Sequence, residues 1–242
     1  WLYLKRKAVW RGMSLRSDLV FVFPGLALVA GAILMPSSQD FLVFQVLLAS
    51  LGVFIICFGR AAKIPSILLG IYGFAISFPL IIERFAQLPY SMSEIKPLMW
   101  TLTELGYPLQ NQGQWVHFTS STGEPISVAI TAACAGPATM GVFISLFALM
   151  MIDTPLTLRK VGYVFLFGVV GTWFQNFIRL VILILVGYYL GEDAMWTAHF
   201  WTIYILFPLW YLFFVYIYFR ETRSLRHGGH KVGTQTGQTA ET

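Results

Sequence analysis

Apolar runs long enough to cross a bilayer constrain this chain more than any other feature of its sequence. Six are present, at residues 19–35, 41–58, 64–82, 134–153, 161–190 and 200–219. A membrane-spanning helix needs about 20 predominantly apolar residues. The chain is 57% hydrophobic and 11% charged, which is more apolar surface than a soluble domain of 242 residues could bury. We therefore predict an all-α polytopic membrane protein with about six transmembrane helices.

A long polar segment, residues 83–130, separates the third apolar run from the fourth. Its charged residues are Glu83, Arg84, Glu94, Lys96, Glu104 and Glu124. Prolines and the turn signal Asn111-Gln112-Gly113 also mark it as lying outside the membrane. The chain thus divides into a basic segment (1–17), three transmembrane helices (18–82), the polar segment (83–130), a second transmembrane bundle (131–219) and a tail (220–242) whose Gly, Thr and Gln content predicts disorder.

The distribution of Lys and Arg predicts the orientation in the membrane. With a cytoplasmic N-terminus and six crossings, the inner segments hold thirteen of the sixteen basic residues. Cytoplasmic loops carry such an excess of positive charge. We therefore expect both termini to be cytoplasmic, with the polar segment and Cys134 facing outward. Two crossings by residues 161–190 would place the basic tail outside, so we prefer one.

Cys134, Arg179 and His199 are predicted to lie at one depth. Each is 19–21 residues from the charged residue that marks the cytoplasmic end of its run. At about 1.5 Å per helical residue, this distance is about 28–32 Å. A hydrocarbon core is about 30 Å thick. The thiol, the guanidinium and the imidazole therefore reach the outer edge of the bilayer on three different helices.

Arg179 is the most informative of the three, because a charged residue inside an apolar run is costly unless it faces water or a partner. Gln175 and Asn176 lie four and three residues earlier, on the same helical face. This polar face is expected to look into the protein. Two alternatives remain: Arg179 could extend to the lipid headgroups, and His199 could belong to an aromatic belt at the membrane interface.

Cys134 lies among small residues in the stretch 131–140, and Pro137 is suited to the first turn of a helix. A helix that begins near Pro137 would place its partially positive end beside the sulfur and favour a thiolate. The alternative is a small apolar residue packed at a crowded helix start. Cys57 is predicted on the opposite side of the membrane, which argues against a disulfide with Cys134.

These residues together resemble a known family. Ala133-Cys134-Ala135-Gly136, then Asn176-Phe177-Ile178-Arg179, then His199 at the head of the last apolar run are similar to the signature of the exosortase/archaeosortase family. The resemblance covers residues 127–219. Members of the family are prokaryotic membrane cysteine proteases or transpeptidases. They usually have Ser or Thr after the cysteine, where this chain has Ala135.

The resemblance implies that the bundle at 131–219 is catalytic and acts on the outer side of a prokaryotic plasma membrane. Substrates would be membrane-anchored secreted proteins with a C-terminal sorting signal, and the acceptor of the cleaved chain would be water, a peptide or a lipid. Cys134 would be the nucleophile, His199 the proton carrier and Arg179 the stabiliser of the oxyanion. Asn176 or Gln175 would support Arg179, and residues 83–130 would cap the site.

Other functions remain open. A transporter or channel could line an anion path with Arg179, and a non-catalytic assembly factor would leave Cys134 unreactive. We expect no cofactor and no metal, because Cys134, His199 and His117 have no recognisable ligand spacing. The net charge of +5 does not point to nucleic acid, since the positive charges lie at the ends of apolar runs.

Overall fold

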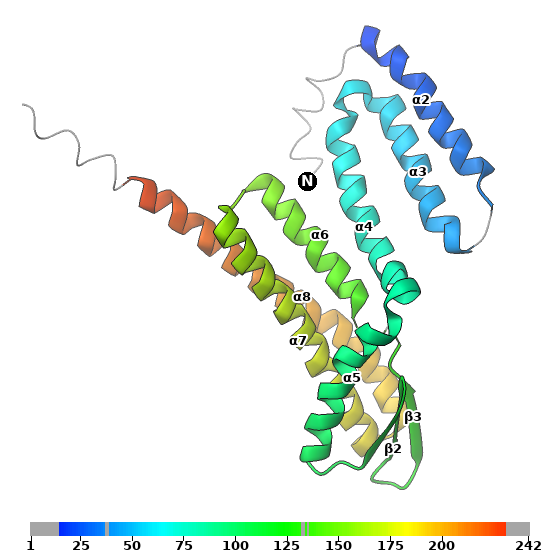
Figure 1. The fold of residues 1–242 in the computed structure, drawn as a ribbon, viewed down its shortest axis with the longest axis vertical. Helices are drawn as coiled ribbons and strands as arrows, with labels where there is room; N and C mark the ends of the chain where they lie inside the picture. Colours follow the sequence, from blue (N-terminus) through cyan, green and yellow to red (C-terminus); the bar gives the residue numbers. More distant parts are fainter. Residues whose placement is uncertain (1–14, 37–38, 132–133, 135, 231–242) are drawn as a thin grey trace, which may run out of the picture. The chain divides into compact units, whose positions relative to one another are not determined.

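The computed structural model describes residues 15–36, 39–131, 134 and 136–230 (Figure 1). Most of the basic segment, the last twelve residues of the tail, and Ala133 and Ala135 beside the cysteine lie outside the described residues. The chain forms two compact units, residues 1–80 and 81–242, and each is described by itself.

The first unit is helical. Helices α2 (Leu15–Leu34) and α3 (Gln39–Phe58) pack along each other, and the 3-10 turn η1 (Gly59–Ala62) leads into α4 (Lys63–Phe85), which continues beyond this unit. Large apolar side chains such as Phe23 and Leu34 are exposed on these helices. An exposed apolar surface of this kind suits a lipid environment, in which such side chains lose nothing by remaining on the outside.

Three apolar helices form the main bundle of the second unit: α6 (Pro137–Asp153), α7 (Leu158–Leu190) and α8 (Glu192–His230). Aromatic rings fill the space between them, with Phe143 edge-on to Phe214 at a centroid distance of 5.0 Å. At one end, Lys160 Nζ lies 2.9 Å from Glu221 Oε2, and the Tyr218 hydroxyl donates to the Thr154 carbonyl over 2.7 Å. The ends predicted to be cytoplasmic therefore meet at one level.

The polar segment folds over the opposite end of α7. It contributes α5 (Gln87–Glu104) and an antiparallel sheet of β1 (Leu109–Gln112), β2 (Trp115–Thr119) and β3 (Pro125–Ala129), in the order β1-β2-β3. Figure 1 shows α5 and this sheet beside the C-terminal end of α7. We call α5 and the sheet the cap. Its inward-facing side chains, including Leu98, Val116 and Ile126, form one buried cluster with Leu180 and Ile184 of α7.

The prediction of a mostly helical membrane protein is confirmed, and two details differ from it, the sheet in the polar segment and the length of α8. Among the described residues, three helices are long and apolar enough to cross a membrane, at Lys63–Phe85, Leu158–Leu190 and Glu192–Arg223. Three other apolar helices are shorter, so six crossings stay a prediction. The sheet in the polar segment was not anticipated. Helix α8 also continues to His230, ten residues into the tail that we expected to be disordered.

Candidate active site

Cys134 lies in the short connection between the cap and the membrane helices. Its backbone N–H donates to the Thr131 carbonyl over 3.0 Å, which closes a turn before α6. Pro137 occupies the first turn of α6, as predicted, and Gly136 caps the helix in a left-handed conformation with φ of +84°. The thiol thus sits beside the N-terminal end of α6, where the unpaired backbone N–H groups concentrate partial positive charge.

Arg179 of α7 connects the loop that carries Cys134 with His199 of α8, and it reaches the loop through Asn176. Its Nη1 donates to Asn176 Oδ1 over 3.3 Å, and its Nη2 lies 3.2 Å from each ring nitrogen of His199. Asn176 Nδ2 donates in turn to the Cys134 carbonyl over 3.3 Å. Because a guanidinium can only donate, the accepting His199 nitrogen must carry a lone pair. The approach of a cationic donor to both ring nitrogens therefore favours a neutral imidazole over an imidazolium.

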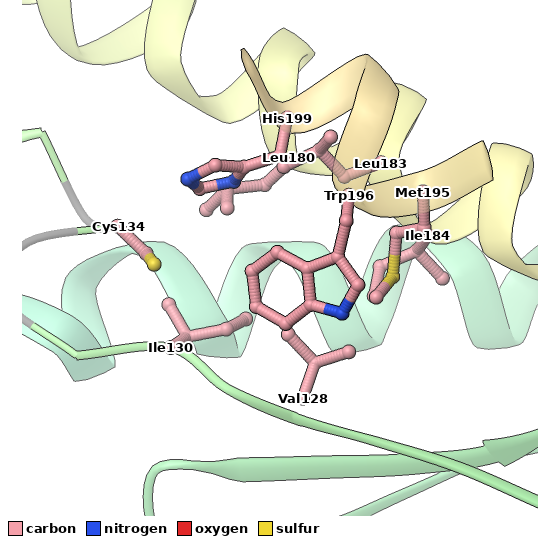
Figure 2. Close-up of a pocket in the computed structure, with 9 residues that line it drawn as sticks. All are labelled: Val128, Ile130, Cys134, Leu180, Leu183, Ile184, Met195, Trp196 and His199. Carbon is pink, nitrogen blue, oxygen red and sulfur yellow. The ribbon is translucent and has the colours of Figure 1, made fainter. Parts of the chain in front are cut away.

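A small enclosed pocket brings the sulfur and the imidazole together (Figure 2). Cys134 and His199 lie at one end of it, and the indole ring of Trp196 extends from α8 towards Val128 of β3. The remaining lining is apolar and comes from Val128, Ile130, Leu180, Leu183, Ile184 and Met195. The free volume is about 20 Å³, which is room for one group of the size of a water molecule. Polar chemistry here would take place where little water is present.

The charge of Arg179 is not neutralised locally. The guanidinium is 2% exposed, and no salt bridge to an acid is recorded for it among the described residues. Its two hydrogen-bonded nitrogens face neutral acceptors, and its Nε has no partner in the described part of the chain. A buried cation of this kind strongly favours an anion that develops nearby.

The other predicted site residues lie apart from this network. Gln175 is half-buried and takes no part in the hydrogen bonds described above. His117 lies on the outward side of the sheet, where Nδ1 is 2.7 Å from Ser127 Oγ. Cys57 is an exposed cysteine of α3. Within the described residues, the sulfur of Cys134 has no recorded hydrogen bond to His199, and such contacts often tighten only when substrate binds.

Glu94 is a residue that the sequence analysis did not place in the site. It lies on the buried side of α5 with Ser91, Ile95, Leu98 and Leu102. The spacing of these residues is that of one helical face. This periodicity could have identified Glu94 as a buried acid, because a carboxylate on the apolar face of a helix is rare unless it has a partner.

A scan against protein-family models places this chain in a known group. The model of the transmembrane exosortase family (Exosortase_EpsH) matches residues 1–216. The chain belongs to the transmembrane exosortase family. The match confirms the resemblance and extends it from 127–219 over the first three apolar helices as well. Searches of curated proteins and of solved structures find no match.

Membership of the exosortase family supports a membrane protein with a role in processing sorting signals. The family match covers both units, so the helices of residues 15–80 are part of the exosortase architecture. It does not by itself assign a role to any residue. The assignments below therefore depend on the arrangement of Cys134, Arg179 and His199.

Proposed function

We propose that this exosortase is a cysteine protease or transpeptidase of the prokaryotic plasma membrane. It would cleave the C-terminal sorting signals of secreted proteins on the outer side, through a thioester on Cys134. The observation that carries the proposal is the buried Arg179 guanidinium, which forms no salt bridge among the described residues and links Asn176 and His199 at the sulfur's pocket. A site of this kind is suited to a reaction that generates an oxyanion.

The reaction would proceed in two stages. His199 takes the proton of the Cys134 thiol, and the sulfur attacks the scissile carbonyl to form a C–S bond. The tetrahedral intermediate then breaks its C–N bond, and His199 gives the proton to the departing amine. The thioester that remains is attacked by water, or by the amine of a peptide or lipid acceptor, which restores the thiol.

Arg179 would stabilise the negative oxygen of the tetrahedral intermediate. Its Nε has no partner among the described residues, and its Nη2 contact to His199 can loosen as the imidazole turns towards the sulfur. Asn176 would hold both ends of this arrangement, since its oxygen accepts from Arg179 and its nitrogen donates to the Cys134 carbonyl. Removal of one such oxyanion donor costs about 100- to 1,000-fold in rate.

The depth of the thiol explains why a substrate would carry its own membrane helix. Cys134 connects the cap to α6 at the outer ends of α7 and α8. The substrate's own membrane helix would hold, at this level, the peptide bond near the motif that precedes the helix, and so limit the search of that bond to two dimensions. The cap, whose strand β3 leads directly to the Cys134 loop, would read the sequence next to that bond.

The nucleophile can be tested with a secreted reporter that carries a C-terminal sorting signal taken from the genomic neighbourhood of this chain. Cys134→Ala and Cys134→Ser should each reduce processing at least about 1,000-fold, while membrane levels of the protein stay unchanged. Cys57→Ala is the matched control and should process normally, because Cys57 is exposed on α3. Processing that survives Cys134→Ala would exclude the thioester mechanism.

A thiol-reactive probe separates this proposal from a transporter or an assembly factor. Labelling of Cys134 should slow by at least about tenfold in Arg179→Gln and in His199→Ala, because both groups favour the thiolate. In a transporter or a scaffold, the labelling rate of Cys134 is not expected to depend on Arg179 and His199. Equal labelling rates in all three proteins would favour one of those functions instead.

A further inference from the structure

Glu94 is a fully buried acid that forms no ion pair in the described part of the chain. Its exposed fraction is 0%, and neither carboxylate oxygen has a hydrogen-bond partner in the described part of the chain. It lies on α5, outside the helices that cross the membrane. Burial of an unpaired acid is costly, so a stable fold would gain from an apolar residue at this position. The retained carboxyl group therefore calls for a functional reason.

The groups around Glu94 connect it to the proposed active site. Burial raises the pKa of its carboxyl group to about 8, and the side-chain amide of Asn176 is close enough to offset part of this rise. The phenol of Tyr90, one turn earlier on α5, also faces the carboxyl group. At neutral pH the carboxyl group is therefore mostly neutral. Asn176 is the residue that contacts both the Cys134 carbonyl and Arg179.

The orientation of the Asn176 amide decides whether those two contacts exist. In the observed orientation, its nitrogen faces the Cys134 carbonyl and its oxygen faces Arg179. In the flipped amide, the oxygen would face the Cys134 carbonyl oxygen and the NH₂ group would face the Arg179 guanidinium. Acceptor would then meet acceptor and donor would meet donor, so both contacts would be lost. The nitrogen has a second hydrogen available for an acceptor. The carbonyl oxygen of the Glu94 carboxyl group can accept this second hydrogen, which would add a third contact to the observed orientation of the amide.

We propose that Glu94 is a positioning residue that holds the Asn176 amide in the orientation needed by Cys134 and Arg179. The proposal rests on the proposed function, since it assigns Glu94 a task in the same reaction. Glu94 touches neither the thiol nor the substrate in this scheme, and it acts only through Asn176. What it must supply is an acceptor at this position, which glutamine also supplies and leucine does not.

The experiment compares Glu94→Gln and Glu94→Leu in the full chain, with Glu104→Leu as a control at an exposed acid of the same helix. Glu94→Leu should lower the rate constant of reporter processing by about 10- to 100-fold with little change in KM, because a misplaced catalytic group has an effect of this size. Glu94→Gln and Glu104→Leu should stay within about twofold of the unaltered protein. A merely structural role predicts the opposite, since leucine is the better buried residue.

A double-mutant cycle tests the route through Asn176. If Glu94 acts only on that amide, then adding Glu94→Leu to Asn176→Ala should change neither processing nor the labelling rate of Cys134 by more than about twofold. Full activity in Glu94→Leu, or additive losses in the double variant, would overturn the positioning role. Processing that persists in Cys134→Ala, with Glu94 unaltered, would instead overturn the proposed function. The labelling rates of Cys134 in the Glu94 variants would still decide the role of Glu94.

Discussion

At the residue scale, Gly136 shows how closely one position controls the arrangement around Cys134. Its φ of +84° lies in the left-handed region, which costs a residue with a side chain about 1–2 kcal/mol. A Cβ atom there would also stand 2.8 Å from Asn176 Cγ and 3.1 Å from both polar atoms of its amide. The glycine therefore serves both the turn into α6 and the close approach of Asn176.

We predict that Gly136→Ala lowers processing by at least about tenfold, because the new methyl group displaces Asn176 from Cys134 and Arg179. Gly123→Ala is the matched control, since Gly123 has φ of +88° and no atom within 4 Å of an added Cβ. Both variants carry the same backbone strain, and only one meets Asn176. Equal activity in the two would show that the approach of Asn176 does not matter for the reaction.

The buried carboxyl group of Glu94 also predicts a pH dependence of stability. Its pKa of about 8 in the folded protein exceeds the ordinary value of 4.5. Between these values the folded state binds more protons than the unfolded state, so stability falls as the pH rises, by up to about 1.4 kcal/mol per pH unit. The pKa of Tyr90 is also raised, so its phenol stays neutral throughout this range.

Glu94→Gln removes this titration. We therefore expect the melting temperature of Glu94→Gln, relative to the unaltered protein in detergent, to rise between pH 5 and pH 8 and then level off. Thermal unfolding followed by fluorescence at several pH values measures this difference. A difference that is constant with pH would mean that Glu94 is ionised at neutral pH in the folded protein.

At the element scale, α7 organises the second unit because each part of its length has a different neighbour. Near its start it packs on the aromatic rings of α6 and α8, in the middle it carries Asn176 and Arg179, and at its end it carries Leu183 and Ile184 into the cap. With 33 residues, α7 is longer than the roughly 20 residues that cross a bilayer, so its apolar end is expected to extend beyond the hydrocarbon core. The cap covers Leu180, Leu183 and Ile184, which explains why this part of the run can remain apolar, whereas Tyr189 and Leu190 at the end of α7 stay exposed.

Close packing of α7 depends on Gly168. A Cβ at this position would overlap the ring of Phe143 and stand 2.7 Å from Phe214. We predict that Gly168→Ala destabilises the protein by about 1–3 kcal/mol, the usual cost of overpacking. Gly162→Ala on the same helix meets no atom within 4 Å and should leave stability unchanged. Thermal unfolding in detergent measures both, and equal melting temperatures would contradict the packing argument.

At the scale of the whole molecule, the predicted orientation places the cap outside the cell and the start of α7 inside. Ser121 in the turn between β2 and β3 is exposed, and so is Leu158 at the start of α7. In a chain with Cys57→Ala and Cys134→Ala, we predict that a membrane-impermeant maleimide labels Ser121→Cys in intact cells and labels Leu158→Cys only after lysis. The reverse pattern would invert the topology and move the thiol to the cytoplasmic side.

The sequence determined the class of this protein and the level of its polar residues. The length of an apolar run is set by the thickness of the lipid bilayer, which each helix meets on its own. The positions of such helices can therefore be predicted without knowing how the helices pack together. The depth of Cys134, Arg179 and His199 follows in the same way, because helical rise is constant. The signature of these residues also identified the family, which the match over residues 1–216 confirms.

Only the tertiary structure decided which groups meet at that level. In the sequence, residues 83–130 are recognisable only as a polar segment, because short strands that are buried on one face give a weak hydrophobic alternation. Their folding into a cap on α7 depends on contacts between residues that are distant in the sequence. For the same reason, Glu94 appeared as one charge among several, and Asn176 and Gln175 appeared equivalent. Packing of α5 against α7 separates them, since it buries Glu94 and Asn176 together and leaves Gln175 outside the network.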